Sequence, residues 1–292
     1  YIVFLDCHFF PTTFFTKMNL WLITVNYGDT APTESLIQSL IACSLPESLK
    51  VAIADNACST ETTSKLNNLS DSIKLNMDIF PFNENRYYWP AAKQVLSNLK
   101  ASSIDYPDWV MVCNNDITFP DEDFFKKLNK IDPIKFPIIG PKILNNTNES
   151  LNPFMTEPLS WRERLYWWLY FISFSGSRGL LESKKFWGKI GWTKKSKNSD
   201  QAKKVYAIHG SAILFSSDFF NKGGWLDDNF DLYGEELSVA EIAKKIGAAI
   251  TYYPELKIIH HEHANTGQTN NKLLFEKARE SHRYIQSTYL KK

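Results

Sequence analysis

The side chains most able to do chemistry are amides and carboxylates that directly follow short apolar segments. The clearest case is WVMVCNNDITF, where a strand-like run breaks into Asn114, Asn115 and Asp116 before it resumes. Such residues favour turns. Several polar ends in succession would also form one rim of a binding crevice beyond the carboxyl ends of parallel strands. The residues at these ends are Asn26, Asp55, Asn56, Asn85, Asn114 and Asp116.

Two clusters of titratable residues occur in the second half of the chain. Glu235 and Glu236 follow an aromatic, glycine-containing stretch at the start of an expected helix, where acids often serve only as partners of the helix dipole. The sequence HHEH contains His260, His261 and His263. These histidines could bind zinc, but they lack the spacing of the HExxH motif.

The order of expected elements predicts a scaffold that brings strand ends together. Apolar runs at 20–25, 51–54, 79–80 and 109–112 alternate with segments of helical spacing at 33–43, 60–69 and 91–99. This rhythm is typical of an α/β fold, with a mostly parallel central sheet flanked by helices. Beyond residue 205 we expect strands at 206–215, 250–253 and 257–259, and helices at 218–222, 238–246 and 272–290. Neither GxGxxG nor GxxxxGK[ST] occurs, so no Rossmann site or P-loop is indicated.

Composition limits the class of protein. The 292 residues carry a formal net charge of +1, which argues against a dedicated nucleic-acid binder. No segment has the length and apolarity needed to span a bilayer. Residues 1–17 make a poor signal peptide, and we expect them to be an extension upstream of the functional domain. The four cysteines form no CxxC pair and are expected to be buried free thiols in a reducing cytosol; they are Cys7, Cys43, Cys58 and Cys113.

The middle of the chain differs in character from its flanks. Residues 161–174 read WRERLYWWLYFISF, and residues 161–204 contain 11 Lys and Arg against three acids, a net charge of +8. We expect 161–174 to form an aromatic helix, either buried against the domain or lying on a membrane with the lysines beside anionic head groups. The expected organisation is an extension at 1–17, a first half at 18–145, an aromatic and basic insertion at 146–205, and a second half at 206–292.

Five segments, in order and spacing, resemble family 2 glycosyltransferases of the GT-A fold, in particular rhamnosyltransferase-like bacterial enzymes. ITVNYGD resembles the opening strand of the family, VAIADNACST its V-V-D-N-x-S segment, and VCNNDITF the strand that ends in a D-x-D-like motif. FPIIGPKIL resembles the next strand, and HGSAILFSSDFFNKGGWLDDNFDLYGEEL the block that ends in Tyr-x-Glu-Asp. The resemblance extends over about residues 20–266 and implies a single domain that holds a nucleotide sugar. It implies that 18–145 is the nucleotide-sugar-binding half, that 206–292 is the acceptor-side half, and that the aromatic helix at 161–174 lies on the acceptor side.

The resemblance implies roles for the polar strand ends. Asp116 matches the last acid of the D-x-D-like motif, which would place a carboxylate on Mg²⁺ or Mn²⁺ and the metal on the diphosphate. His260 matches a family histidine that is sometimes a metal or phosphate ligand. The implied donor-binding residues are Thr24, Asn26, Asp55, Asn85, Asn114 and Asn115. Taken alone, Asp55 could instead cap the following helix.

Several positions depart from the family pattern. Asn114 replaces the first acid of D-x-D, which leaves a single carboxylate for the metal. Tyr87 stands where the family's Asn-x-Gly segment has glycine. In the helix after the acidic block, Ser238 and Ile242 stand where Asp and Arg are common.

By the same resemblance, the acceptor approaches Trp225, Asp227 and Asp228, although the two aspartates alone would suggest a turn. Glu236 takes the position of the family's second acid and is expected to be the general base, with Glu235 as its competitor. At its usual pKa of about 4.3, Glu236 would be ionised at neutral pH and ready to accept a proton.

The expected activity is that of an inverting, metal-dependent hexosyltransferase. It would move a sugar from a nucleotide-diphosphate sugar to a hydroxyl of a glycan or glycolipid, in cell-surface polysaccharide synthesis. One alternative is a nucleotidyltransferase, but VNYGDTAPT lacks its Gly-rich phosphate loop and basic residue. Another is a non-catalytic nucleotide- or glycan-binding protein, which Asn114 favours and Glu235 and Glu236 oppose. We expect a cytoplasmic protein with peripheral contact to the inner face of the cell membrane.

Overall fold

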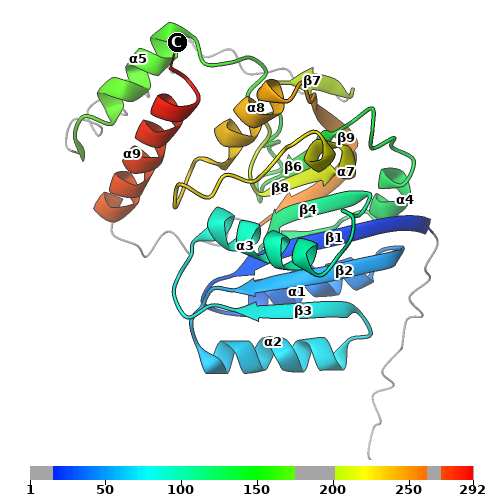
Figure 1. The fold of residues 1–292 in the computed structure, drawn as a ribbon. Helices are drawn as coiled ribbons and strands as arrows, with labels where there is room; N and C mark the ends of the chain where they lie inside the picture. The colour runs from blue at the N-terminus through cyan, green and yellow to red at the C-terminus, as the bar shows by residue number, and fades with distance from the viewer. Residues whose placement is uncertain (1–15, 175–200, 262–270, 292) are drawn as a thin grey trace, which may run out of the picture.

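A computed structural model describes residues 16–174, 201–261 and 271–291, in which helices cover both faces of one sheet (Figure 1). The strands are β1 (Thr16–Asn26), β2 (Pro46–Asp55), β3 (Asn76–Pro81), β4 (Trp109–Asn114), β5 (Ile117–Thr118), β6 (Ile138–Leu144), β7 (Lys203–Val205), β8 (Ala212–Ser216) and β9 (Ile250–His260). The helices are α1 (Ala31–Ile41), α2 (Thr60–Ser72), α3 (Tyr88–Ala101), α4 (Phe124–Leu128), α5 (Trp161–Tyr170), α7 (Ser217–Asn221), α8 (Glu235–Lys245) and α9 (Asn271–Thr288).

The strand order places the predicted polar ends at one edge. In the described part of the chain the sheet runs β3-β2-β1-β4-β8-β6-β9-β5, with β7 paired to β9. β1, β2, β3 and β4 are mutually parallel, and β8 is antiparallel to both β4 and β6. Since β9 is parallel to β6, it runs in the same direction as β4. The carboxyl ends of β1, β2, β4 and β9 and the start of β8 therefore share one edge of the sheet.

The first strand shows why these segments are apolar without interruption. Side chains of a strand point alternately to its two faces. Leu20 and Leu22 pack into the core on the α1 side, whereas Trp21 and Ile23 pack into the core on the α3 side. A strand that is covered on both faces has no position for a polar side chain except at its ends.

The predicted α/β fold with a mostly parallel sheet is confirmed, and the second half of the chain adds antiparallel pairs. Of the segment predicted as a strand at 206–215, only Ala212–Phe215 lies in β8. Residues 206–211 form an irregular segment instead, because His209 and Gly210 bond to Asn152 and Glu236 rather than to a neighbouring strand. The two strands expected at 250–253 and 257–259 are one strand, β9, with a register shift opposite Pro141 and Lys142.

The aromatic segment forms α5, which is shorter than expected and ends at Tyr170. A capping box starts it, since Ser160 and Glu163 bond reciprocally across the first turn. One face of α5 packs against α9 through Phe171 and Phe275, whose ring centres are 5.7 Å apart (Figure 1). None of the described helices is long and apolar enough to cross a membrane. Residues 1–15 of the expected extension and most of the basic segment, 175–200, lie outside the described residues.

The cysteines only partly follow the expectation of buried thiols. Cys43 and Cys113 are buried and free, and burial raises the pKa of each thiol to about 12. Cys58 is exposed, so the prediction is wrong for this residue. It lies in the turn between β2 and α2, where its backbone has a φ of +55°. Cys7 lies outside the described residues.

Candidate active site

Amides from two strand ends form a buried hydrogen-bonded cluster at the carboxyl edge of the sheet. Asn26, at the end of β1, accepts a hydrogen bond from Thr33 of α1 at 2.6 Å. The Asn115 side chain donates to the same Thr33 hydroxyl at 2.9 Å. Asn26 and Thr24 are fully buried, and Asn115 is nearly so. These three predicted donor-binding residues lie together. The hydrogen bonds to Thr33 fix the turn that follows β4 relative to α1.

A second set of hydrogen bonds, made by the Asn56 side chain, fixes the loop between β3 and α3. The Asn56 side chain donates to Asn85 Oδ1 at 2.7 Å and to the Tyr87 carbonyl at 3.1 Å, and its own Oδ1 accepts from the Arg86 backbone at 2.8 Å. Tyr87 has φ +57°, a conformation that normally requires glycine. This explains why the family pattern has glycine there, and the Asn56 bonds hold the strained residue in place.

Asp55 is buried and bonds to the following helix. Its Oδ2 accepts a hydrogen bond from Thr63 of α2 at 2.6 Å, and its Oδ1 accepts from the Ala57 backbone at 3.3 Å. The N-cap of α2 is Ser59, so Asp55 supports the helix from inside rather than as its cap residue. Its predicted contact with the nucleotide stays a prediction.

Asp116 and His260 come together because β5 pairs with the end of β9. Ile117 lies opposite His260, and the His261 backbone donates to the Asp116 carbonyl at 2.9 Å. This pairing brings Asp116 Oδ1 to 3.1 Å from His260 Nε2. The Asn114 amide nitrogen lies 3.2 Å from the same Nε2. A proton on the ring nitrogen, donated to the carboxylate, or a cation bound by both groups would stabilise this contact.

This pair fits a hard divalent cation that is completed by substrate. Carboxylate and imidazole are ligands that Mn²⁺ accepts, and Mg²⁺ typically binds one or two carboxylates together with substrate phosphates. Among the described residues there is no group of three His, Cys, Asp or Glu that could hold a metal ion. His261 contacts Thr118 at 2.8 Å, and His263 lies outside the described residues, so the zinc alternative for HHEH gains no support.

The two glutamates begin α8 and pack directly against Gly210. The Gly210 backbone donates to Glu236 Oε1 at 3.1 Å, and the Gly234 backbone donates to Glu235 Oε2 at 2.9 Å. A Cβ at Gly210 would lie 2.6 Å from Glu235 Cγ, so only glycine fits here. The pair is thus fixed by the turn before β8 as well as by its own helix.

The expectation of an ordinary pKa for Glu236 is wrong. Burial, together with the adjacent charge of Glu235, raises the pKa of Glu236 to about 8. Burial also raises the pKa of Glu235. Desolvation disfavours the charged form, and a second carboxylate nearby disfavours it further. In the free protein, Glu236 is therefore largely protonated at neutral pH.

Two residues that the sequence did not single out join these groups into one site. The Tyr88 hydroxyl donates to the Gly210 carbonyl at 2.9 Å, and burial and the charges of Glu235, Glu236 and Asp116 raise its pKa. Acids of both clusters therefore contribute to raising the pKa of this phenol. His209 is the second residue, with its ring centre 6.0 Å from that of His260. Its pKa falls to about 4 through burial and His260. A histidine directly before a glycine that opens a strand was the only sequence signal for it.

The predicted acceptor-side residues lie beyond Glu235, toward the far end of α8. Asp227 is buried and accepts hydrogen bonds from Tyr284 at 2.8 Å and Tyr289 at 2.5 Å, so it anchors α9. Asp228 pairs with Lys93 of α3 at 3.2 Å. Trp225 is partly exposed and lines, with Asp227 and Tyr284, a cavity of about 520 Å³ between α8 and α9.

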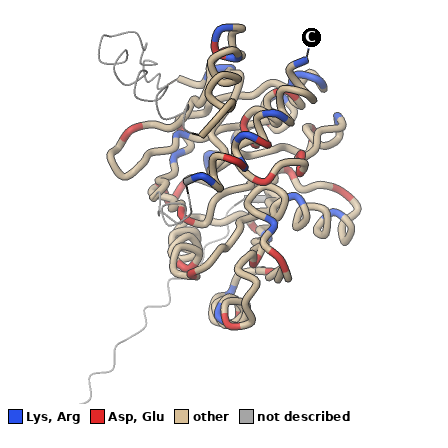
Figure 2. The backbone as a smooth tube through the Cα atoms, turned by 90° about the vertical axis from the view of Figure 1, so that its left-hand side faces the viewer, with Lys and Arg blue, Asp and Glu red and all other residues tan. Residues whose placement is uncertain are grey.

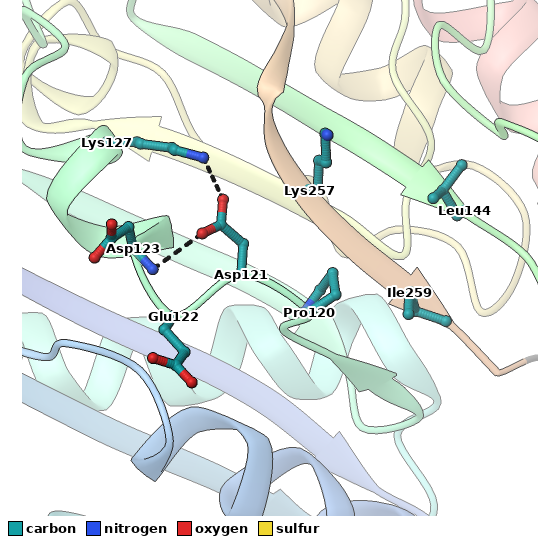
Figure 3. Close-up of a pocket in the computed structure, with 8 residues that line it drawn as sticks. All are labelled: Pro120, Asp121, Glu122, Asp123, Lys127, Leu144, Lys257 and Ile259. Carbon is teal, nitrogen blue, oxygen red and sulfur yellow. Dashed lines mark hydrogen bonds and ion pairs between the residues drawn. The ribbon is translucent and has the colours of Figure 1, made fainter.

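A second hollow, of about 680 Å³, lies beside α4 and β9 (Figure 3). Asp121 lies at its centre, where it pairs with Lys127 and accepts from the Asp123 backbone at 3.0 Å. None of the residues predicted to be functional lines this hollow.

The raised pKa of Glu236 predicts how stability depends on pH. A carboxyl whose pKa is higher in the folded state than its ordinary 4.5 stabilises the fold below that value, and this stabilisation is lost as pH rises toward about 8. Glu236→Gln removes the titration. The difference in Tm between variant and wild type should therefore grow in favour of the variant from pH 5 to pH 8.5 in thermal denaturation. Glu61→Gln, at an exposed position, is the control and should show no such growth. A constant difference for Glu236→Gln would contradict the raised pKa.

Comparison with known proteins identifies the fold. Neither a protein-family model nor a curated protein matches the sequence. Among the solved structures that are similar to this chain are the following three. The first is the mannosyltransferase PcManGT from Pyrobaculum calidifontis in complex with GDP-Man and Mn²⁺, with TM-score 0.53, 12% identity, and coverage of 94% of this chain and 71% of that one. The second is S. aureus TarS 1-349 with UDP-GlcNAc, with TM-score 0.59, 13% identity, and 92% and 66% covered. The third is GalNAc-T7 with UDP, GalNAc and Mn²⁺, with TM-score 0.56, 11% identity, and 84% and 44% covered.

The chain spans about two thirds of the first two structures and under half of the third. The structural similarity establishes the fold, whereas sequence identities this low do not identify the substrates. The α/β sheet with its flanking helices is the GT-A fold that these glycosyltransferases share.

Proposed function

We propose that this protein is an inverting glycosyltransferase that moves a hexose from a nucleotide-diphosphate sugar to a hydroxyl of a glycan or glycolipid. One observation carries the proposal. Asp116 and His260, which fit a cation, and Glu235 and Glu236, which fit a base, are linked through His209 and Gly210 at the carboxyl edge of a GT-A sheet: the His209 ring lies 6.0 Å from that of His260, and the Gly210 backbone bonds to Glu236. The rhamnosyltransferase-like subgroup and a role in cell-surface polysaccharide synthesis are parts of the same proposal that rest on the sequence resemblance.

The chemistry follows from these positions. The acceptor oxygen attacks the anomeric carbon while its proton passes to the Glu236 carboxylate. The bond between that carbon and the diphosphate oxygen breaks on the opposite face, and the nucleoside diphosphate leaves with the bonding electrons. Asp116 and His260 would hold Mg²⁺ or Mn²⁺, which, when bound, neutralises charge on the departing diphosphate. Asn114, Asn85 and Asp55 would bind the rest of the donor, and Trp225, Asp227 and Asp228 would border the acceptor.

The solved structures support a nucleotide-sugar donor. The three similar structures are complexes with GDP-Man and Mn²⁺, with UDP-GlcNAc, and with UDP, GalNAc and Mn²⁺. A panel of nucleotide sugars, assayed for hydrolysis and transfer with and without Mn²⁺, tests the proposal. Turnover of a nucleoside triphosphate with a sugar 1-phosphate and release of pyrophosphate, without turnover of any nucleotide sugar, would favour a nucleotidyltransferase. Binding without turnover would favour the non-catalytic alternative.

We also propose that α5 holds the protein at the inner face of the cell membrane, beside a lipid-linked acceptor. Its outer stripe is exposed, with Trp161 at 69%, Trp168 at 59% and Ile172 at 54%, while the opposite face packs on α9. An exposed stripe of this kind needs a partner. Trp at the edge of an apolar helix suits a bilayer interface. Basic residues lie on α5 and along α9 toward the C-terminus (Figure 2), and the sequence from 161 to 204 has net charge +8 (11 − 3), which complements anionic lipid.

Asp116→Asn should weaken Mn²⁺-dependent binding of the nucleoside diphosphate, because an amide is a poorer ligand for a hard cation than a carboxylate. Isothermal titration calorimetry with UDP and GDP, with and without Mn²⁺, measures the effect. Asp121→Asn, in the second hollow, is the matched control and should bind as the wild type does. Unchanged Mn²⁺-dependent affinity in Asp116→Asn would show that the assignment of Asp116 is wrong.

Glu236→Gln keeps the size of the side chain and removes the base. It should lower kcat by roughly 10²–10⁴-fold with little change in donor binding. Because residues one apart on a helix point about 100° from each other, Glu235→Gln should cost less in turnover and more in stability. Steady-state measurements of kcat and KM for both variants show which glutamate is the base. The reverse order would make Glu235 the base, and near-normal transfer by both would end the catalytic reading of this pair.

Membrane binding predicts that the protein floats with liposomes that contain anionic lipid and less with neutral ones. Trp161→Ser combined with Trp168→Ser should abolish flotation, because it removes the two aromatic anchors of the stripe. Leu273→Ser, an exposed apolar position on α9, is the control. If the wild type floats with neither kind of liposome, the membrane proposal fails.

A further inference from the structure

His209 lies between the two functional clusters of the site. It precedes Gly210, whose backbone bonds to Glu236, and its ring contacts the ring of His260 at 6.0 Å between centres. The edge of Phe154 approaches the same imidazole at 6.0 Å. The sequence resemblance assigns no role to this residue.

Long-range hydrogen bonds fix the backbone that carries the ring. The His209 backbone donates to Asn152 Oδ1 at 2.7 Å, and the Asn152 amide in turn donates to the Pro141 carbonyl of β6 at 2.8 Å. Asn152 is almost completely buried. The imidazole is therefore held on the sheet edge by β6 on one side and by α8, through Gly210, on the other.

The hydrogen bonds of the ring determine which nitrogen carries the proton. The Ser211 backbone N–H donates to His209 Nδ1 at 3.2 Å, and the Ser211 hydroxyl lies 3.0 Å from the same atom. A backbone amide is always a donor, so Nδ1 is an acceptor and the proton is on Nε2. In the described parts of the chain, no residue accepts a hydrogen bond from this Nε2. A nitrogen that carries a proton cannot bind a cation, so His209 is a donor for a ligand rather than a third metal ligand.

We propose that His209 binds the diphosphate of the donor by donating a hydrogen bond from Nε2 to a phosphate oxygen. The inference rests on the proposed function, which places the diphosphate beside Asp116 and His260, and His260 is the residue against which the imidazole packs. An anionic oxygen is the strongest acceptor for such a donor. A hydroxyl of the transferred sugar is the competing ligand, and the probes below separate the two because UDP and GDP lack that sugar.

The test measures affinity for UDP and for GDP in the presence of Mn²⁺ by isothermal titration calorimetry. His209→Phe keeps an aromatic ring and removes the donor, and it should weaken binding by about ten- to a hundredfold. His209→Gln retains an N–H donor and should recover part of the loss. His282→Phe is the matched control. This histidine is also mostly buried and packs on Phe171, 4.7 Å between ring centres, in the contact between α9 and α5, and its replacement should leave affinity unchanged.

The dependence on Mn²⁺ gives an independent readout. The Mn²⁺ concentration needed for half-maximal binding should be the same in wild type and His209→Gln, since His209 does not bind the cation. Equal diphosphate affinity in all three proteins, or a shifted Mn²⁺ requirement in His209→Gln, would overturn the inference while leaving the proposed function intact. A wild type that binds neither diphosphate would overturn both.

Discussion

The covering of β1, β2 and β4 by helices on both faces is the constraint on which the rest of the structure depends. A strand buried on both sides loses all contact with water except at its ends. The polar groups of the first half are therefore concentrated at one edge, where each must find a partner or a ligand. Asn26 and Asn115 form hydrogen bonds with Thr33, and Asn56 forms hydrogen bonds with Asn85 and the loop that follows it. These hydrogen bonds lie inside the protein, although Asn26 Nδ2 has no partner among the described residues. Asn114 and Asp116 are left beside His260.

The second half of the chain completes this edge through one crowded turn. Gly210 leaves no room for a side chain because Glu235 and Glu236 pack against it, and its neighbour His209 is tied to Asn152. Histidine, glycine and the glutamate pair are thus held at fixed spacing by contacts that cross three elements. Such rigid support is what a reaction needs, since small displacements of reacting groups reduce rates strongly.

Much of this arrangement could be predicted from the sequence. The features that could not be predicted have one cause in common, which is that they depend on contacts between residues far apart in the chain. The apolar runs predicted the strands of the first half, and the polar ends predicted the edge, because both signals are local. The site roles of His209 and Tyr88 depend on bonds to residues far away in sequence, Asn152 and Gly210 respectively, which no local pattern reveals. The pairing of β5 with β9 is likewise long-range, yet it sets the distance between Asp116 and His260. Tyr87 is recognised from the sequence only as a departure from a glycine position, and its positive φ becomes apparent only in the structure.

The pKa of Glu236 links the two halves of the site. A carboxyl with its usual pKa is a weak base, whereas one with a pKa of about 8 binds a proton firmly and matches a base that works near neutral pH. The cost is that the group is largely protonated before the donor arrives. Tyr88 is influenced by Asp116 and by both glutamates, so these charges lie within range of one another. Positive charge held at Asp116 favours the ionised form of Glu236, and the negative charge of a diphosphate opposes it. In the proposed mechanism, the ionisation of Glu236 would therefore depend on how completely the charge of the bound donor is neutralised, which would couple proton transfer to correct loading of the donor.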